Sequence, residues 1–267
     1  MECIKTKKHS NDNLPVSKMK LSDLKPIDFG PGSEKGSVEV DKIVYSNKNN
    51  IKLLILSDIH DEEIVLEKAK TICEKEKPDY IFIAGDTTNC SVSFVEDTLD
   101  MFKTFAPTFI VPGNNEPENV LKFLESRKEY IHEKRIELAD SLNIVGFGFS
   151  NITPYGTPGE LSEEEIYERM SRLDIDQNTL LLCHCPPYGI FDQGAGSSRE
   201  KHIGSVAIRK IIEEKKPFLM FCGHAHEWFG TKKLGETTIV KVLAAKLGGA
   251  VILTITNKRI NAEFIRI

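Results

Sequence analysis

The sequence contains no run of about twenty apolar residues, the length that an α-helix needs to cross a bilayer. It also lacks an excess of positive charge, because 35 Lys and Arg residues stand against 40 Asp and Glu residues. This acidic balance disfavours non-specific binding of nucleic acid, which relies on a basic surface. The segment from Met1 to Lys8 lacks the apolar centre of a secretory signal peptide. We therefore expect a cytoplasmic protein that has no membrane partner.

Glycine and proline occur at ordinary levels, with 18 and 12 residues, and 40% of the chain is hydrophobic. This composition is typical of a protein with a packed core, and 267 residues can form one large α/β domain or two small ones. The first 36 residues are polar and show no apolar period. We expect a polar N-terminal extension over residues 1–36 and a single domain over residues 37–267.

Apolar strands alternate with amphipathic helices in the first half of the chain. The run that begins at Ile51 is apolar at nearly every position, which predicts a strand buried on both faces in the centre of a sheet. The alternation of strand and helix favours a parallel sheet with helices outside. Further strands are predicted at 80–84 and 108–111, and helices at 61–77, near 93–105 and near 118–126.

The second half of the chain mixes short strands with two helices. Ser162 and Glu165 have the spacing of a capping box, which opens a helix to about residue 173, and another helix is expected over 202–214. Asn257 and Lys258 fit a two-residue hairpin turn. We expect antiparallel strands after His226. The remaining predicted strands, including an antiparallel edge strand at 37–45, cover 37–45, 136–138, 143–149, 179–183, 218–222, 230–234, 237–242, 250–256 and 259–265.

Five predicted strands end at side chains that can bind a metal ion. A packed core needs strands, but it gives no reason for each strand to end at Asp, Asn or His. Along an extended chain, alternate side chains share a face, so we expect Asp58 and His60 to point to the same side. For this pair alone, the alternative is an N-capping Asp with an incidental surface His. The strand-end residues are Asp58, His60, Asp86, Asn114, His184, His224 and His226.

The chemistry of these side chains indicates which ions they can bind. Two carboxylates, four imidazoles and one amide suit Mn, Fe, Co, Ni or Zn better than Ca. Seven groups are too many for one tetrahedral site, and two ions about 3.5–4 Å apart are typical of centres that cleave phosphoesters. A separate zinc site built from Cys183, Cys185 and Cys222 is an alternative use of the nearby thiols. Their spacing does not match a zinc knuckle, so we expect these cysteines to be small core residues.

In their order along the chain, these segments resemble the calcineurin-like metallophosphoesterase superfamily. The resemblance runs from about Lys52 to the C-terminus. Within the superfamily, the chain is similar to the small prokaryotic, Icc-like phosphoesterases. The segments that carry the resemblance to the superfamily are Asp58-x-His60, Gly85-Asp86, Gly113-Asn114-Asn115-Glu116, His184 and Gly223-His224-x-His226. The segments that carry the likeness to the Icc-like phosphoesterases are His184-Cys-Pro-Pro-Tyr, His202-Ile-Gly-Ser-Val-Ala-Ile-Arg and Gly223-His-Ala-His-Glu.

The resemblance implies a four-layer α/β/β/α sandwich of two mixed sheets flanked by helices. It also implies a dinuclear-metal-dependent phosphoester hydrolase, in which a hydroxide that bridges two divalent transition-metal ions attacks a small phosphoester substrate. The implied ligands of the first ion are Asp58, His60 and His226, those of the second are Asn114, His184 and His224, and Asp86 bridges the two ions.

The chain departs from the family pattern at position 115. Many members carry a His there that assists the leaving group, whereas Asn115 can donate a hydrogen bond but cannot supply a proton near neutral pH. We therefore expect Asp86 and Asn115 to be the catalytic positions of a phosphodiesterase more than of a monoesterase. Residues 241–249 also lack the Asn-Pro-Gly turn that is common in the family.

Three alternatives stay open at this stage. His202 and Ser205 stand at the expected start of a helix, where they could contact phosphate, and ordinary N-terminal capping is the other interpretation. A nuclease is an alternative enzyme, although the acidic balance disfavours it. A non-catalytic scaffold that binds proteins on a degenerate phosphoesterase fold is the alternative from another class. The oligomeric state does not follow from the sequence.

Overall fold

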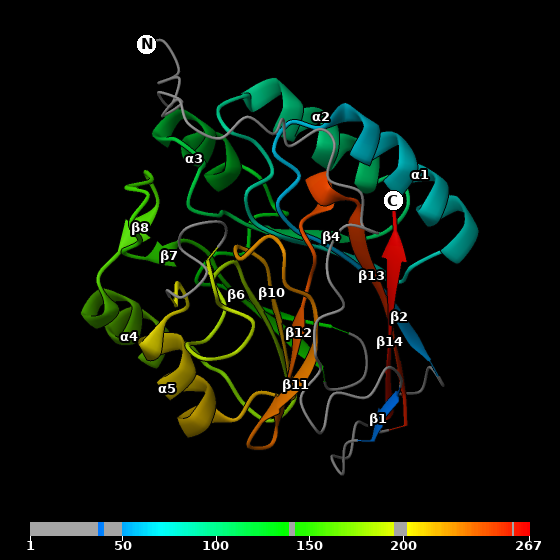
Figure 1. The fold of residues 1–267 in the computed structure, drawn as a ribbon. Helices are drawn as coiled ribbons and strands as arrows, with labels where there is room; N and C mark the ends of the chain where they lie inside the picture. Colours follow the sequence, from blue (N-terminus) through cyan, green and yellow to red (C-terminus); the bar gives the residue numbers. More distant parts are fainter. Residues whose placement is uncertain (1–36, 40–49, 139–141, 195–201, 258) are drawn as a thin grey trace.

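The computed structural model describes residues 37–39, 50–138, 142–194, 202–257 and 259–267 (Figure 1). Two six-stranded mixed sheets pack against each other, and helices cover the outer face of each sheet. The predicted four-layer α/β/β/α sandwich is therefore confirmed. The extension predicted for residues 1–36 lies outside the described residues.

The first sheet has the strand order β1-β14-β13-β2-β3-β4. Strands β2, β3 and β4 run parallel, and β13 pairs antiparallel with β2. The predicted central position of β2 is confirmed, because it lies between β13 and β3. The strand bounds are β1 (Ser37–Glu39), β2 (Ile51–Leu56), β3 (Tyr80–Ala84), β4 (Thr108–Val111), β13 (Gly249–Thr256) and β14 (Arg259–Arg266).

Two predictions concern the outer part of this sheet. Strand β1 is an antiparallel edge strand on β14, as predicted, while residues 40–45 of the predicted strand lie outside the described residues. Thr256 pairs with Arg259, which leaves two residues for the predicted hairpin turn between β13 and β14. Asn257 there has a φ of 46°, a left-handed conformation that Asn tolerates.

The second sheet has the strand order β11-β12-β10-β9-β6-β5. Four of its strands, β6, β9, β10 and β12, run parallel, with an antiparallel strand at each edge. The predicted antiparallel pairing after His226 is confirmed for β11 with β12 and for β13 with β14, but it is wrong for the second edge of β12. This strand forms a hairpin with β11, and its other edge pairs parallel with β10. The bounds are β5 (Arg135–Glu137), β6 (Asn143–Phe147), β9 (Thr179–Cys183), β10 (Leu219–Cys222), β11 (Gly230–Leu234) and β12 (Thr237–Lys241), with a separate two-stranded pair of β7 (Ser150–Asn151) and β8 (Glu160–Leu161).

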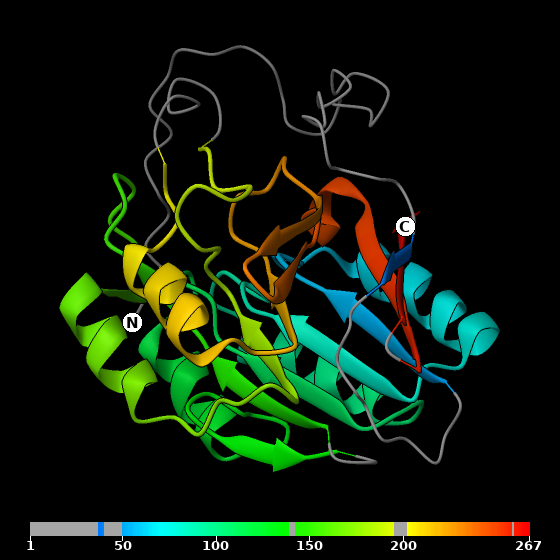
Figure 2. The ribbon, with the colours of Figure 1, turned by 90° about the horizontal axis from the view of Figure 1, so that it is seen from below.

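Helices pack on the outer faces, as Figures 1 and 2 show. Helices α1 (Glu63–Glu76), α2 (Val92–Phe102) and α3 (Glu118–Glu125) cover the first sheet. Helices α4 (Glu163–Ser171) and α5 (Val206–Lys215) cover the second. None of these described helices is both long enough and apolar enough to span a membrane.

Local capping explains where two of the helices begin. The predicted capping box is confirmed at α4, where Ser162 and Glu165 exchange hydrogen bonds with each other's backbone N–H groups. Helix α5 begins at Val206, so the predicted start at His202 is wrong. Ser205 is the reason, because it is extended and its hydroxyl accepts a hydrogen bond from the backbone of Ile208.

The core lies in three apolar layers, one between the sheets and one beneath each set of helices. Strand β2 contributes to two of them. Leu53 and Ile55 face the second sheet, while Leu54 and Leu56 face the helices of the first. This burial on both faces explains why the strand has apolar residues at successive positions instead of alternate ones.

Candidate metal centre

The seven predicted ligand residues follow the carboxyl ends of five parallel strands. Asp58 and His60 follow β2, Asp86 follows β3 and Asn114 follows β4, all in the first sheet. His184 follows β9, and His224 and His226 follow β10, in the second sheet. The two sheets meet here through hydrogen bonds, such as those from the His224 backbone N–H to the side-chain carboxylate of Asp58. The carboxyl ends of parallel strands are where α/β proteins place their sites.

Four of these residues have left-handed backbone conformations. The φ angles are 56° at Asp58, 53° at His60, 51° at Asp86 and 74° at His224. The extended chain predicted for Asp58 and His60 is therefore wrong, although their side chains do converge. Residues other than glycine adopt this conformation at a cost of about 1–2 kcal/mol each. Such strain concentrates at functional sites.

Glycine is required where the loops that carry these residues approach one another. A Cβ atom on Gly113 would lie 2.0 Å from Oδ1 of Asp86. A Cβ atom on Gly223 would lie 1.7 Å from Oγ of Ser57. Only a residue without a side chain fits at either position, so both glycines of the sequence motifs have a steric role.

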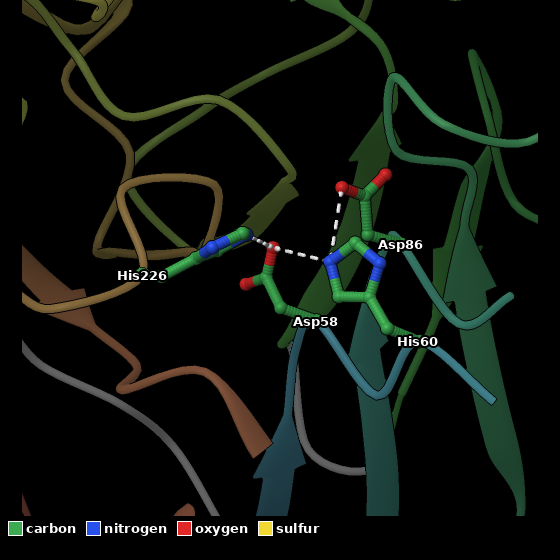
Figure 3. Close-up of side chains that lie close together, drawn as sticks. All are labelled: Asp58, His60, Asp86 and His226. Carbon is green, nitrogen blue, oxygen red and sulfur yellow. Dashed lines mark ion pairs between the residues drawn. The ribbon is translucent and has the colours of Figure 1, made fainter. Parts of the chain in front are cut away.

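The first group of side chains comprises Asp58, His60, Asp86 and His226, whose potential ligand atoms all lie within 4.8 Å of one another (Figure 3). Asp58 lies between the two imidazoles. Its Oδ1 is 3.2 Å from Nε2 of His226 and 4.0 Å from Nε2 of His60. Convergence of this kind, with buried carboxylates at its centre, suits a divalent cation.

The second group comprises Asn114, His184 and His224. Oδ1 of Asn114 lies 2.8 Å from Nε2 of His184 and 2.8 Å from Nδ1 of His224. Asp86 connects the groups, because its Oδ2 lies 3.6 Å from Nε2 of His60 and 3.6 Å from Nε2 of His184. All seven predicted residues are thus brought together, and each group draws side chains from both sheets.

The proton positions provide a test of whether these residues fit metal ions. Nδ1 of His184 lies 2.8 Å from the carbonyl oxygen of Ala84, which can only accept, so this nitrogen carries the proton. Nε2 of His184 therefore carries a lone pair that faces another acceptor, Oδ1 of Asn114. These two lone pairs repel each other, and a cation bound by both atoms would remove the repulsion. His60 is similar, because its Nδ1 lies 2.9 Å from Oδ1 of Asn89 and its Nε2 is buried without a hydrogen-bond partner. The residues present fit divalent cations.

The imidazoles of the centre favour their neutral forms. Burial lowers the pKa of His60 and lowers that of His224 to about 3. Protonating either ring would place a charge in a site shielded from water. Neutral imidazole is the form that binds a metal, so both rings can coordinate at neutral pH without releasing a proton.

The carboxylates of the centre favour their ionised forms. Burial raises the pKa of Asp58, but the hydrogen bond and electrostatic interaction with His226 outweigh burial and hold the pKa well below its ordinary value. Burial also opposes ionisation of Asp86, and electrostatic interaction with His184 and His60, together with the backbone hydrogen bond from Asn115, outweighs it, so the pKa of Asp86 is lowered. Divalent cations in the same place would favour the ionised carboxylates in the same way.

Asn115 supports the central carboxylate. Its backbone nitrogen donates to Oδ1 of Asp86 at 2.9 Å, and its side-chain nitrogen donates to Oδ2 at 2.5 Å. Both donors are thus engaged by Asp86, and Asn115 orients the carboxylate that lies between the two groups.

Glu116 joins the loops beneath the centre, a role that its place in the sequence motif did not reveal. Its buried carboxylate accepts hydrogen bonds from the backbone N–H groups of Thr87, at 2.6 Å, and Gly113, at 2.8 Å. Burial and the charge of Asp86 raise the pKa of Glu116 well above its ordinary value. The residue fixes the loop after β3 against the loop after β4.

The structure places the two predicted phosphate contacts outside the seven-residue centre. The hydroxyl of Ser205 caps α5 and donates to Oε2 of Glu163 at 2.7 Å. Glu163 also accepts from the backbone of Val206 and Ala207, so a carboxylate from α4 occupies the N-terminus of α5. Capping, the alternative interpretation, therefore describes Ser205. No sequence signal links Glu163 to a helix that begins more than forty positions later.

His202 precedes the helix instead of opening it. Its Nδ1 lies 2.8 Å from Oδ1 of the buried Asp192, and its ring lies 4.6 Å from that of Tyr188 between centroids. The side chain is 36% exposed, which leaves it open to solvent. Asp192 was not singled out by sequence reasoning.

The three cysteines beside the ligand histidines are core residues, as predicted. Cys183, Cys185 and Cys222 are free and fully buried among apolar side chains of the second sheet and its helices. Burial raises the pKa of the Cys222 thiol to about 12. A protonated, enclosed thiol is an inert packing group.

Comparison with known proteins gives one family and several relatives. Residues 51–228 match the model of the calcineurin-like phosphoesterase family. The chain is 34% identical over 170 residues to MJ1162, an uncharacterized protein of Methanocaldococcus jannaschii, covering 62% of this chain and 78% of that protein. It is 26% identical over 137 residues to a subunit of the nuclease SbcCD of Staphylococcus epidermidis, covering 47% of this chain but only 36% of that relative.

A solved structure has the same fold. The crystal structure of TT1561 from Thermus thermophilus superposes with a TM-score of 0.62, covering 81% of this chain and 98% of that one. Its sequence identity is 16%, so the likeness concerns the arrangement of sheets and helices alone.

Proposed function

Because the chain belongs to the calcineurin-like phosphoesterase family, we propose that it is a dinuclear-metal-dependent hydrolase of small phosphodiesters. The observation that supports this most directly is the position of Asp86. Its Oδ2 lies 3.6 Å from an imidazole nitrogen of each side-chain group. A single carboxylate between two sets of ligands suits a pair of ions better than one.

We propose the same two ligand sets as the sequence indicates. Asp58, His60 and His226 hold the first ion, and Asp86 bridges to the second. Asn114, His184 and His224 complete the second site. The mixture of imidazole, carboxylate and amide suits Mn, Fe, Co, Ni or Zn.

When bound, such ions neutralise phosphoryl oxygens and lower the pKa of a coordinated water. The chain's own residues prepare the site for this chemistry. Asn115 holds the carboxylate of Asp86 in place with two hydrogen bonds. Burial keeps His60 and His224 neutral, and hydrogen bonds from His226 and Asn115 favour the ionised forms of Asp58 and Asp86.

The preference for diesters rests on Asn115. An amide cannot protonate a departing oxygen, and both nitrogens of this residue already donate to Asp86. The reaction then depends on the intrinsic acidity of the leaving group. We also propose that His202 contacts the substrate, because Asp192 fixes its ring while leaving the side chain exposed. Ser205 is not part of the proposal, since its hydroxyl is engaged by Glu163 and by the capping bond.

The test is a matrix of metals and substrates. The protein is stripped with a chelator, reloaded with Mn, Fe, Co, Ni or Zn in turn, and assayed on bis(p-nitrophenyl) phosphate, p-nitrophenyl phosphate and single-stranded DNA. We expect no turnover in the stripped protein, and a diester rate at least about tenfold above the monoester rate in the best metal. Preferential cleavage of DNA would support the nuclease alternative. Metal binding without hydrolysis of any ester would support the scaffold.

A further inference from the structure

We propose that Lys246 is a substrate-binding residue of this centre, whose ammonium group contacts a phosphoryl oxygen of the bound ester. It lies in the short 3-10 helix η4 (Ala245–Leu247), between β12 and β13. This segment is part of residues 241–249, where the sequence lacks the turn common in the family. The inference rests on the proposed function and identifies a residue that recognises the substrate's charge.

The backbone of this segment is attached directly to the loops that carry the metal-binding side chains. The Lys246 N–H donates to the carbonyl of Asp58 at 3.1 Å, and the Ala245 N–H donates to the carbonyl of Ser57 at 2.7 Å. The Ala244 N–H donates to the carbonyl of His226 at 3.3 Å. Three successive amides therefore hold Lys246 against the first group of side chains.

The half-buried side chain of Lys246 extends from this anchored backbone, and its charge interacts with this group. Burial lowers its pKa, and the carboxylates of Asp58 and Asp86 oppose that effect. In turn, the positive charge of Lys246 lowers the pKa of His60. These interactions agree with the backbone contacts, which place Lys246 beside the centre.

The ammonium has no partner to justify its position. Across the described part of the chain, its nitrogen forms no hydrogen bond and no ion pair, although the side chain is half-buried. Lys241, which lies nearby in sequence, differs because its fully buried Nζ donates to the carbonyl of Val242 at 3.0 Å. A partly buried charge without a partner is unfavourable unless something else compensates it.

The metal ions themselves cannot provide that compensation. Two divalent cations carry more positive charge than Asp58 and Asp86 can balance, so an additional ammonium group beside them is repelled. Glu62 and Glu227 add negative charge to its surroundings, but no carboxylate of the described residues forms an ion pair with the ammonium, so an anion that enters the site can become its partner. A phosphoester supplies such an anion, because its phosphoryl oxygens carry negative charge that grows or is redistributed as the ester bond breaks.

This proposal makes two predictions of opposite sign for one substitution. Lys246→Met removes a charge that attracts substrate and repels metal. We expect kcat/KM for bis(p-nitrophenyl) phosphate to fall about 10–100-fold. We expect Mn²⁺ affinity, measured by chelator competition without substrate, to rise about 3–10-fold. If Lys246 only held the loop in place, its substitution would lower both kcat/KM and the Mn²⁺ affinity.

The controls separate charge from shape and folding. Lys246→Arg keeps the charge and should retain most of the metal affinity of the wild type and part of its turnover. Lys70→Met removes an exposed lysine on α1 and should change neither quantity. If Lys246→Met melts at a lower temperature than the wild type, Lys246→Gln is the second variant. It also removes the charge, but its side chain is less apolar than that of Met.

A third measurement keeps the proposal independent of catalysis. Inorganic phosphate binding to the Mn²⁺-loaded protein, measured by calorimetry, should weaken about tenfold in Lys246→Met and Lys246→Gln. If the wild type hydrolyses no ester, the proposed function fails, and the phosphate measurement still tests Lys246. Unchanged phosphate affinity, or weaker metal binding in both variants, would overturn the assignment of Lys246.

Discussion

Asn115 donates two hydrogen bonds to Asp86, one from its backbone nitrogen at 2.9 Å and one from its side chain at 2.5 Å. The pair links the loop after β4 to the carboxylate that lies between the two groups of metal-binding side chains. Many members of the family carry a His at position 115, so this chain has a fixed hydrogen-bond donor where they have a group that can release a proton. The first two predictions concern these two residues.

Asp86→Asn should weaken both metal sites and nearly abolish turnover. The substitution removes the negative charge and one acceptor, and the new amide nitrogen would face the donors of Asn115. Metal content is measured on the purified variant, alongside activity in the best metal. Asp97→Asn on the exposed surface of α2 is the matched control and should behave as the wild type. Two ions per chain in Asp86→Asn, with normal turnover, would exclude a bridging role.

Asn115→His should make the enzyme less dependent on the acidity of the leaving group. A general acid typically contributes about 10²–10⁴ in rate, and an ordinary alcohol needs that help far more than nitrophenol does. We expect kcat/KM of the wild type to fall steeply across diesters of rising leaving-group pKa, and the variant to recover part of the rate on alkyl esters. A flat profile in the wild type, with chemistry rate-limiting, would show that another acid is present.

Glu116→Ala should destabilise the metal-free protein. The substitution leaves the buried N–H groups of Thr87 and Gly113 without their acceptor. Each unsatisfied donor costs about 1–3 kcal/mol, so we expect a loss of about 2–6 kcal/mol in urea unfolding at pH 7. Glu118→Ala, at an exposed position of α3, should change the stability by less than about 0.5 kcal/mol. Equal effects of the two substitutions would contradict a structural role for Glu116.

His132 should make the stability of the metal-free protein depend on pH. Burial lowers its pKa to about 3, and its side chain is 9% exposed. Below its ordinary pKa of about 6.5, the unfolded chain binds a proton that the folded protein does not, so the folded state loses stability as the pH falls. At one pKa unit per 1.36 kcal/mol, this group accounts for about 2 kcal/mol between pH 6.5 and pH 5.

His132→Asn isolates this contribution. The amide oxygen of Asn can accept the hydrogen bond that Gly148 N–H donates to Nδ1 of His132 at 2.9 Å, but it does not titrate. Urea unfolding is measured at pH 6.5 and pH 5. Between these pH values, the free energy of unfolding should fall by about 2 kcal/mol less in the variant than in the wild type. Parallel pH profiles for the two proteins would mean that His132 is protonated in the folded state as readily as in the unfolded one.

Much of the fold followed from local sequence pattern. The apolar run at β2 predicted a central strand, and Ser162 with Glu165 predicted the start of α4, because burial and capping each depend on a few neighbouring residues. The convergence of the seven candidate ligand side chains followed from strand ends, since the carboxyl ends of parallel strands share one edge. The parallel pairing of β12 with β10 did not follow, because a hairpin pattern specifies one neighbour and leaves the other undetermined.

Features that depend on distant contacts could not be predicted. The left-handed backbone at Asp58 and His60 is stabilised by hydrogen bonds to the loop after β3, and nothing in the local pattern indicates it. Glu163 caps a helix more than forty positions away, which is visible only once α4 and α5 are packed together. The sequence does not distinguish Lys246 from the other lysines. Its place beside the centre follows only from the backbone hydrogen bond between its N–H and the carbonyl of Asp58.

Each group of metal-binding side chains takes members from both sheets, and this arrangement has a consequence for assembly. Asp58 and His60 come from one sheet and His226 from the other, so a correct first site forms only when the two halves are in register. Ions bound by side chains of both sheets would hold the two sheets together. Metal content would therefore measure the fraction of the protein in which the sheets are correctly packed. Removal of bound ions should therefore lower the free energy of unfolding, although the apolar core between the sheets would still hold them together.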